Sequence, residues 1–204
     1  VQSESKAGIA LVADKSDPTA GDFQSSANKV VSLMPDSYTV NRFDVDTLGT
    51  SGTHSGVADA LRQGSGIMHY VGHSSLIALG RDSSLLTASE IESMSDTGSP
   101  MLMVSMACST ASFGYPAMNS IGESAVLKAG GAAVGFFGAT GLSRNYLADI
   151  MAEGFYLGLF DPANSRVGDA VVQAKRYSSE QGAKHFALDI YNLLGDPAML
   201  APVQ

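Results

Sequence analysis

Short apolar runs alternate with amphipathic stretches along most of the chain. An apolar run bounded by turn-forming residues is typical of a strand that is covered on both faces of a sheet. The clearest such run is MLMVSMA at 101–107, because almost all of its residues are apolar. The pattern predicts strands at residues 8–13, 37–43, 66–71, 101–107 and 131–138.

Helical spacing of apolar residues, or a capping pattern, marks several of the segments between these strands. Thr87 and Glu90 form one capping-box pattern, and Ser120 and Glu123 form a second. The predicted helices cover residues 23–34, 56–63, 87–94, 120–129, 145–159 and 167–181.

The remaining segments are polar or rich in turn-forming residues. We expect loops at 14–22 and 44–53, and a turn at the GDP of 195–197 that closes the domain. A chain that alternates strands and helices of these lengths forms a mostly parallel sheet with helices on both faces. We therefore predict one α/β domain over about residues 7–201.

Composition narrows the possible functions. The formal charge of −8 and the pI of about 4.8 argue against nucleic acid as a partner. The most apolar stretch, residues 130–142, is shorter than the roughly 20 residues of a membrane-spanning helix. The single cysteine excludes an intrachain disulfide and a zinc site built from several thiolates. Because the chain begins with Val1, we expect it to be a piece of a longer protein.

Three polar residues, Asp14, His73 and Cys108, follow the ends of predicted strands. The loops at the carboxyl ends of parallel strands form the functional site of such a sheet. If the third and fourth strands are neighbours, about 4.8 Å apart, the His73 imidazole and the Cys108 thiol lie close enough to act together. An imidazole that takes the thiol proton creates a reactive thiolate. A small core cysteine and a surface histidine are the alternatives, and the pattern alone does not decide.

Motifs in a fixed order add a resemblance to a known family. HYVGHSS at 69–75 and MACSTASFG at 106–114 resemble the histidine and cysteine signatures of the gingipain-type cysteine peptidases, within the wider caspase-like group. Similar segments follow at 119–127, 130–140 and 191–200. The resemblance implies a caspase-like three-layer sandwich, with a single gingipain-like catalytic domain over residues 1–204.

The resemblance also implies the roles of the site residues in a cysteine endopeptidase that works through an acyl-enzyme. Cys108 is then the nucleophile and His73 the general base and acid, while the N–H groups of Ser74 and Cys108 form the oxyanion hole. The family usually has glycine where this chain has Ser74, and a side chain there restricts the backbone. Asp14 is the implied third catalytic residue, beside His73 in a sheet of order 2-1-3-4. Its alternative role is to form a turn.

Substrate recognition rests on the same resemblance. Some gingipains hold a basic P1 side chain with an aspartate at the start of the first helix, and Asp22 is the matching residue. Its alternative role is the N-cap of that helix. The other implied pocket walls are Val71, Met106, Asn145 and Tyr146.

No metal or organic cofactor takes part in the implied chemistry. Gingipains sometimes hold structural calcium, for which Asp14, Asp17 and Asp22 are candidate ligands; the alternative is a solvated acidic loop. The implied partners are a protein or peptide substrate and neighbouring domains of the same longer chain. The implied location is secreted or at the cell surface, although the first residues lack the features of a signal peptide. Two rival functions are a sortase-like transpeptidase with the same dyad and a catalytically inactive binding or structural module.

Overall fold

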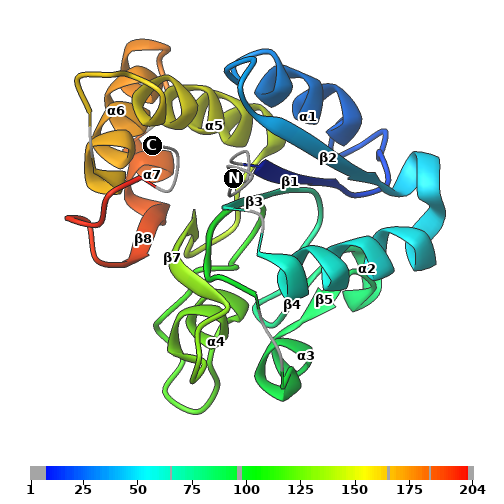
Figure 1. Cartoon of the computed structure of the whole chain (residues 1–204). Helices are drawn as coiled ribbons and strands as arrows, with labels where there is room; N and C mark the ends of the chain where they lie inside the picture. The colour runs from blue at the N-terminus through cyan, green and yellow to red at the C-terminus, as the bar shows by residue number, and fades with distance from the viewer. Residues whose placement is uncertain (1–7, 65, 96–97, 165, 184, 202–204) are drawn as a thin grey trace, which may run out of the picture.

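The computed structural model describes residues 8–64, 66–95, 98–164, 166–183 and 185–201. Its central sheet contains β1 (Gly8–Ala13), β2 (Thr39–Asp44), β3 (Ile67–Val71), β6 (Met101–Met106), β7 (Ala133–Ala139) and β8 (Tyr191–Gly195). Within the described residues the sheet order is β2-β1-β3-β6-β7-β8 (Figure 1). Neighbouring strands are parallel, except that β8 runs antiparallel to β7.

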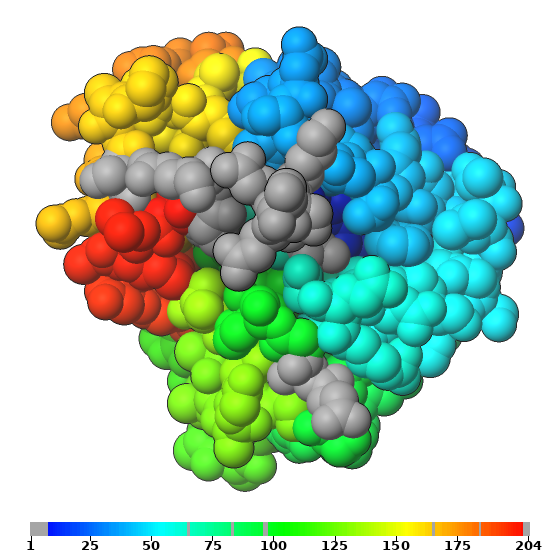
Figure 2. Space-filling view, viewed as in Figure 1, coloured from blue at the N-terminus to red at the C-terminus, as the bar shows by residue number. Residues whose placement is uncertain are grey.

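Helices cover both faces of this sheet, which makes three layers (Figure 1). The helices on one face are α1 (Phe23–Val31), α5 (Asn145–Leu159) and α6 (Val167–Glu180), and those on the other are α2 (Val45–Gln63), α3 (Ala88–Ser93) and α4 (Ile121–Leu127). A short helix, α7 (His185–Ile190), leads directly into β8. Figure 2 shows that, on the face in view, the blue-to-cyan first part of the chain and the yellow-to-red last part lie on opposite sides of the molecule.

Alternating strand residues build the two hydrophobic cores. In β1, Ile9 and Leu11 pack with α1 and α5, while Ala10 and Val12 pack with α2. Successive side chains of a strand point to opposite faces, so a strand between two helical layers is mostly apolar along its whole length. This arrangement explains the continuous apolar runs that mark β1 and β6 in the sequence.

The predicted architecture is confirmed. The observed order contains the predicted 2-1-3-4 arrangement, and α5 has the predicted bounds of 145–159. Both capping boxes are present, one between Thr87 and Glu90 and one between Ser120 and Glu123. The chain therefore has the mostly parallel, three-layer α/β fold that its sequence pattern indicates.

The polar loop predicted at 44–53 is wrong, because α2 begins at Val45. Gly49 interrupts this helix with a φ of +67° and produces a kink. Beyond the kink, Thr53 and Val57 are buried against the sheet. Tertiary packing of these side chains outweighs the low helix propensity of the glycine and threonine residues in the segment.

The sequence pattern also fails to predict β8 and a small hairpin that follows β3. The hairpin consists of β4 (Ala78–Leu79) and β5 (Leu86–Thr87), joined through a 3₁₀ turn, η1 (Arg81–Ser83). Strands of two residues are too short to show an alternating pattern. None of the helices in the described part of the chain is long and apolar enough to cross a membrane.

Candidate active site

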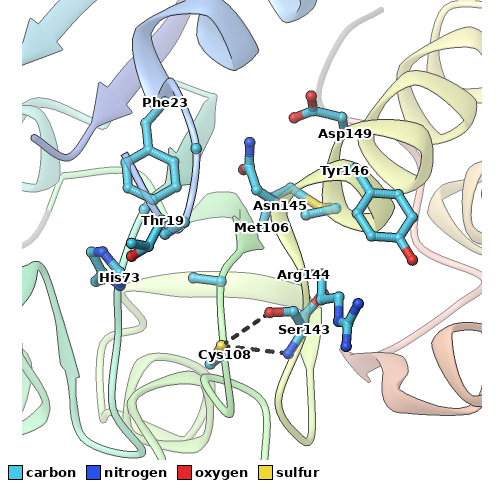
Figure 3. Close-up of a pocket in the computed structure, with 15 residues that line it drawn as sticks. Thr19, Phe23, His73, Met106, Cys108, Ser143, Arg144, Asn145, Tyr146 and Asp149 are labelled. Carbon is cyan, nitrogen blue, oxygen red and sulfur yellow. Dashed lines mark hydrogen bonds between the residues drawn. The ribbon is translucent and has the colours of Figure 1, made fainter. Parts of the chain in front are cut away.

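The carboxyl ends of β1, β3 and β6 lie side by side at one edge of the sheet. Ala13 pairs with Val71, and Val71 pairs with Met106. A cavity of about 620 Å³ opens beyond these strand ends, and both His73 and Cys108 line it (Figure 3). The parallel register therefore brings the two predicted residues to one site.

A crowded turn carries His73. At the preceding Gly72, a Cβ would lie 2.3 Å from the Cβ of Asp14 and 2.5 Å from the Tyr70 hydroxyl. The Tyr70 hydroxyl donates a hydrogen bond to the His73 carbonyl. Burial, followed by the nearby Asp14 charge, raises the pKa of Tyr70 well above its usual value, so the hydroxyl keeps its proton and acts as a donor. Only glycine fits this turn without displacing the side chains around it.

The His73 imidazole contacts an ion pair. Its Nε2 atom lies 3.2 Å from Oδ2 of Asp17 and 3.0 Å from Nη2 of Arg81. The Arg81 guanidinium is itself paired with Asp17. The Phe23 ring meets the imidazole edge-on, with 5.3 Å between the ring centroids. Both of these polar contacts are made through Nε2 of the imidazole.

Asp14 lies beside His73, but it holds the backbone rather than the ring. Its buried carboxylate accepts hydrogen bonds from the backbone N–H groups of Lys15, His73 and Arg81. The expected contact with the imidazole is made by Asp17 instead. Asp14 follows β1 directly and reaches only the start of the His73 turn, whereas Asp17 lies three residues further along the loop.

The Cys108 sulfur is held by the main chain of the loop that follows β7. Sγ lies 3.4 Å from both the carbonyl oxygen and the backbone nitrogen of Ser143 (Figure 3). The next residue, Ser109, has a φ of +56°, which residues other than glycine rarely adopt. Its N–H donates to the Gly141 carbonyl at 2.9 Å. The chain thus turns sharply after Cys108 and leaves the half-buried thiol on the cavity wall.

Ser74 connects the histidine and cysteine loops. Its Oγ donates to the Cys108 carbonyl at 2.6 Å. The local antiparallel bridge uses the N–H groups of Ser75 and Gly80, so it does not involve the Ser74 N–H. Ser74 is not among the described non-glycine residues with a positive φ. A serine therefore meets no backbone conflict at this position.

Most of the expected pocket walls line the cavity. Met106, Asn145 and Tyr146 are among its lining residues. Val71 is not, because its side chain is buried in the core and reaches only a separate void of about 10 Å³. The prediction for Val71 is therefore wrong for this cavity.

Asp22 does not line the cavity either. It is the N-cap of α1, and its carboxylate accepts from the Ser25 N–H at 2.8 Å. The carboxylate at the cavity belongs to Asp149 on α5, which pairs with Lys29 on α1 at 2.6 Å. Asp149 lies four residues after Asn145, and this helical spacing is the sequence signal that could have identified it.

The three aspartates of the acidic loop each have contacts within the protein. Asp14 holds backbone N–H groups, Asp17 contacts His73 and Arg81, and Asp22 caps a helix. Within the residues that the structure describes, no three histidine, cysteine, aspartate or glutamate side chains gather to hold a metal ion.

A histidine and a cysteine that follow neighbouring parallel strands, in a sheet covered on both faces, define a caspase-like α/β fold. The sequence model of peptidase family C25 matches residues 2–202, and the chain therefore belongs to this family. Among the curated proteins, no match was found.

Solved structures share this fold at low sequence identity. The Arg specific cysteine proteinase gingipain R (RgpB) matches with a TM-score of 0.78 and 16% identity over 97% of this chain and 48% of that one. The complex of Porphyromonas gingivalis RgpB pro- and mature domains matches with a TM-score of 0.81, 16% identity and coverages of 97% and 49%. The Saccharomyces cerevisiae separase–securin complex matches less well, with a TM-score of 0.58, 15% identity and coverages of 94% and 12%. The chain thus spans about half the length of the gingipain structures.

Proposed function

We propose that this chain is the catalytic domain of a cysteine endopeptidase, with Cys108 as the nucleophile and His73 as the general base and acid. The observation that carries the proposal is that both side chains line one cavity at the ends of adjacent parallel strands. Membership of a peptidase family supports the reaction class.

Peptide hydrolysis would follow from this arrangement in two halves. The His73 imidazole takes the thiol proton while Sγ of Cys108 attacks the scissile carbonyl carbon, and a C–S bond forms. The imidazolium then gives its proton to the leaving amine as the C–N bond breaks. In the second half, His73 takes a proton from water, whose oxygen forms a bond to the thioester carbon. The C–S bond then breaks, the acid leaves, and the imidazolium returns its proton to the sulfur.

The negative oxygen of each tetrahedral intermediate needs fixed donors. The N–H groups of Ser74 and Cys108 are the proposed donors, because the Ser74 side chain ties the two loops together at the Cys108 carbonyl. Preorganised donors of this kind stabilise developing charge without reorganising during the reaction. Asp14 contributes by holding the His73 backbone, and Asp17 by orienting the ring.

A basic P1 side chain is the substrate feature that the cavity fits best. Asp149 supplies a carboxylate at the wall, and its present partner, Lys29, has a side chain that is 61% exposed. The Asp149 side chain is only 15% exposed, so a substrate cation would have to displace Lys29 to pair with this carboxylate. The net charge of −8 also attracts basic peptides. RgpB, whose fold this chain shares, is described as Arg specific.

The domain is also proposed to work as part of a longer chain. The gingipain structures are about twice its length, which supports neighbouring domains as intramolecular partners. Membership of this family further supports a secreted or cell-surface location.

A series of peptides varied at P1 tests the proposal. Wild type should cleave after Arg or Lys, and Cys108→Ala and His73→Ala should each lose at least about a thousandfold in kcat/KM. His185→Ala is the matched control, because His185 is exposed on α7 and should retain full activity. Cleavage that survives Cys108→Ala, or a wild-type thiol that no peptidyl thiol-reactive probe labels, would overturn the proposal. An added amine distinguishes transpeptidation, which would yield the amide product.

A further inference from the structure

The main chain of Ser143 contacts the Cys108 sulfur with both of its polar groups. The carbonyl oxygen can accept from the thiol, and the N–H can donate to the sulfur, each across 3.4 Å. Once the proton has left, the N–H stabilises the negative sulfur and the carbonyl repels it. The position of the Ser143 backbone decides whether attraction by the N–H or repulsion by the carbonyl dominates at the sulfur. The contacts that fix this backbone therefore affect the reactivity of Cys108.

Contacts with the segment around β8 hold this loop. Thr140 donates to the Ile190 carbonyl from its backbone nitrogen at 2.7 Å and from Oγ1 at 3.0 Å. At the other end of the loop, the Ser143 hydroxyl lies 2.8 Å from the Tyr191 hydroxyl. A side-chain hydrogen bond therefore fixes the residue whose main chain contacts the sulfur.

Tyr191 is a rigid anchor. It is fully buried at the start of β8, opposite Ala139 of β7, and its ring lies 6.0 Å from that of Phe137. Burial raises the pKa of Tyr191, so the hydroxyl remains protonated under ordinary conditions. A buried hydroxyl needs a hydrogen-bond partner, and among the described residues Ser143 provides one.

We propose that Tyr191 is a positioning residue that acts through Ser143 to hold the main chain of the loop against the Cys108 sulfur. The inference rests on the proposed function, because it assumes that Cys108 reacts. Tyr191 does not touch the substrate; its hydroxyl sets the position of the N–H donor beside the nucleophile. Without this anchor, the Ser143 N–H would no longer be held at its position beside the sulfur, so the thiolate would lose this donor and the reactivity of Cys108 at neutral pH would fall.

Four single variants, and the double variant Tyr191→Phe/Ser143→Ala, test this chain of contacts. Tyr191→Phe and Ser143→Ala each remove one hydroxyl of the pair, while Ser143→Thr keeps the hydroxyl. Tyr156→Phe is the matched control, because Tyr156 is equally buried and its hydroxyl instead contacts Nδ1 of His69 at 3.0 Å. Two rates are measured for each variant. The first is the rate at which iodoacetamide alkylates Cys108, the only cysteine, at neutral pH, monitored by intact-protein mass spectrometry. The second is the steady-state rate of cleavage of the best peptide.

Tyr191→Phe and Ser143→Ala should each lower the alkylation rate and kcat by about tenfold, the effect of one lost hydrogen bond, with KM unchanged. The double variant should be no slower than either single variant, because both changes break the same contact. Ser143→Thr should restore both rates to near wild type, and Tyr156→Phe should leave them unchanged.

Equal alkylation rates in wild type, Tyr191→Phe and Ser143→Ala would overturn the inference, as would an equal loss in Tyr156→Phe. Ser143→Ala keeps the test decisive if Tyr191→Phe does not fold, because Ser143 lies in a partly exposed loop. The alkylation assay needs no peptidase activity. A protein that cleaves nothing but shows the expected alkylation pattern would therefore refute the proposed function and leave the positioning role standing.

Discussion

Mild acid should destabilise this protein through one buried histidine, His69. His69 lies in β3 with 1% of its surface exposed, and its Nδ1 atom lies 3.0 Å from the Tyr156 hydroxyl. Burial lowers the pKa of His69 from 6.5 to about 3. The folded protein therefore keeps this imidazole neutral at pH values where an unfolded chain protonates it.

The direction and size of the effect follow from proton linkage. Between pH 6.5 and about 3, the unfolded chain binds a proton at His69 that the folded protein does not, so stability falls as the pH falls through this window. Each pH unit below 6.5 removes about 1.4 kcal/mol. At pH 5, the loss attributable to His69 is therefore about 2 kcal/mol.

Urea unfolding at pH 7 and pH 5, followed by far-UV circular dichroism, measures this loss. His69→Gln provides the comparison, because its amide can still meet the Tyr156 hydroxyl but does not titrate. Wild type should lose about 2 kcal/mol more than His69→Gln between the two pH values, since all carboxylates are common to both proteins. The control His185→Gln, at an exposed position, should behave like wild type. Parallel losses in wild type and His69→Gln would refute the reasoning.

Three further outcomes concern the site and its supports. Gly72→Ala should lower the stability by about 1–3 kcal/mol in thermal melts, because a Cβ at residue 72 overlaps the buried side chain of Asp14. An unchanged melting temperature would contradict this prediction. Asp17→Asn should lower kcat about tenfold and leave KM unchanged, because it weakens the contact that orients the imidazole; an equal loss in the exposed control Asp82→Asn would argue against that role. Asp22→Ala removes the N-cap of α1, so it should cost about 1 kcal/mol of stability without altering the P1 preference. Asp149→Ala removes the carboxylate at the cavity, so it should raise KM for Arg peptides about tenfold. The reverse pattern would assign the substrate contact to Asp22.

The parts of the site that the sequence predicts are those adjacent to the parallel strands. His73 follows β3 within two residues and Cys108 follows β6 within two residues, so the sheet order alone determines that they meet at one edge. Apolar runs identify such strands well, because both faces of the sheet are covered. Met106 is likewise predictable, since it is the last residue of β6.

The residues that contact the proposed catalytic groups are much harder to predict. Arg81 meets Asp17 because the hairpin of β4 and β5 folds back beside the loop after β1, and two-residue strands leave no periodic signal. Asp22 and Asp149 show the same difficulty. Asp22 precedes α1 and Asp149 lies within α5, and both helices are near the cavity. Only the packing of α1 against α5 decides which of the two carboxylates faces the cavity.

The strand β8 contacts the loop beside Cys108, although it lies outside the histidine and cysteine motifs. It adds an antiparallel edge to a parallel sheet, and its first residue, Tyr191, lies opposite the end of β7. The loop that leaves β7 must therefore pass both β8 and the Cys108 turn, and it makes hydrogen bonds to each. We expect a change at the β8 end of this loop to move the same backbone that contacts the sulfur. Substitutions in β8 should thus alter reactivity at Cys108 even though β8 contributes no group to the chemistry.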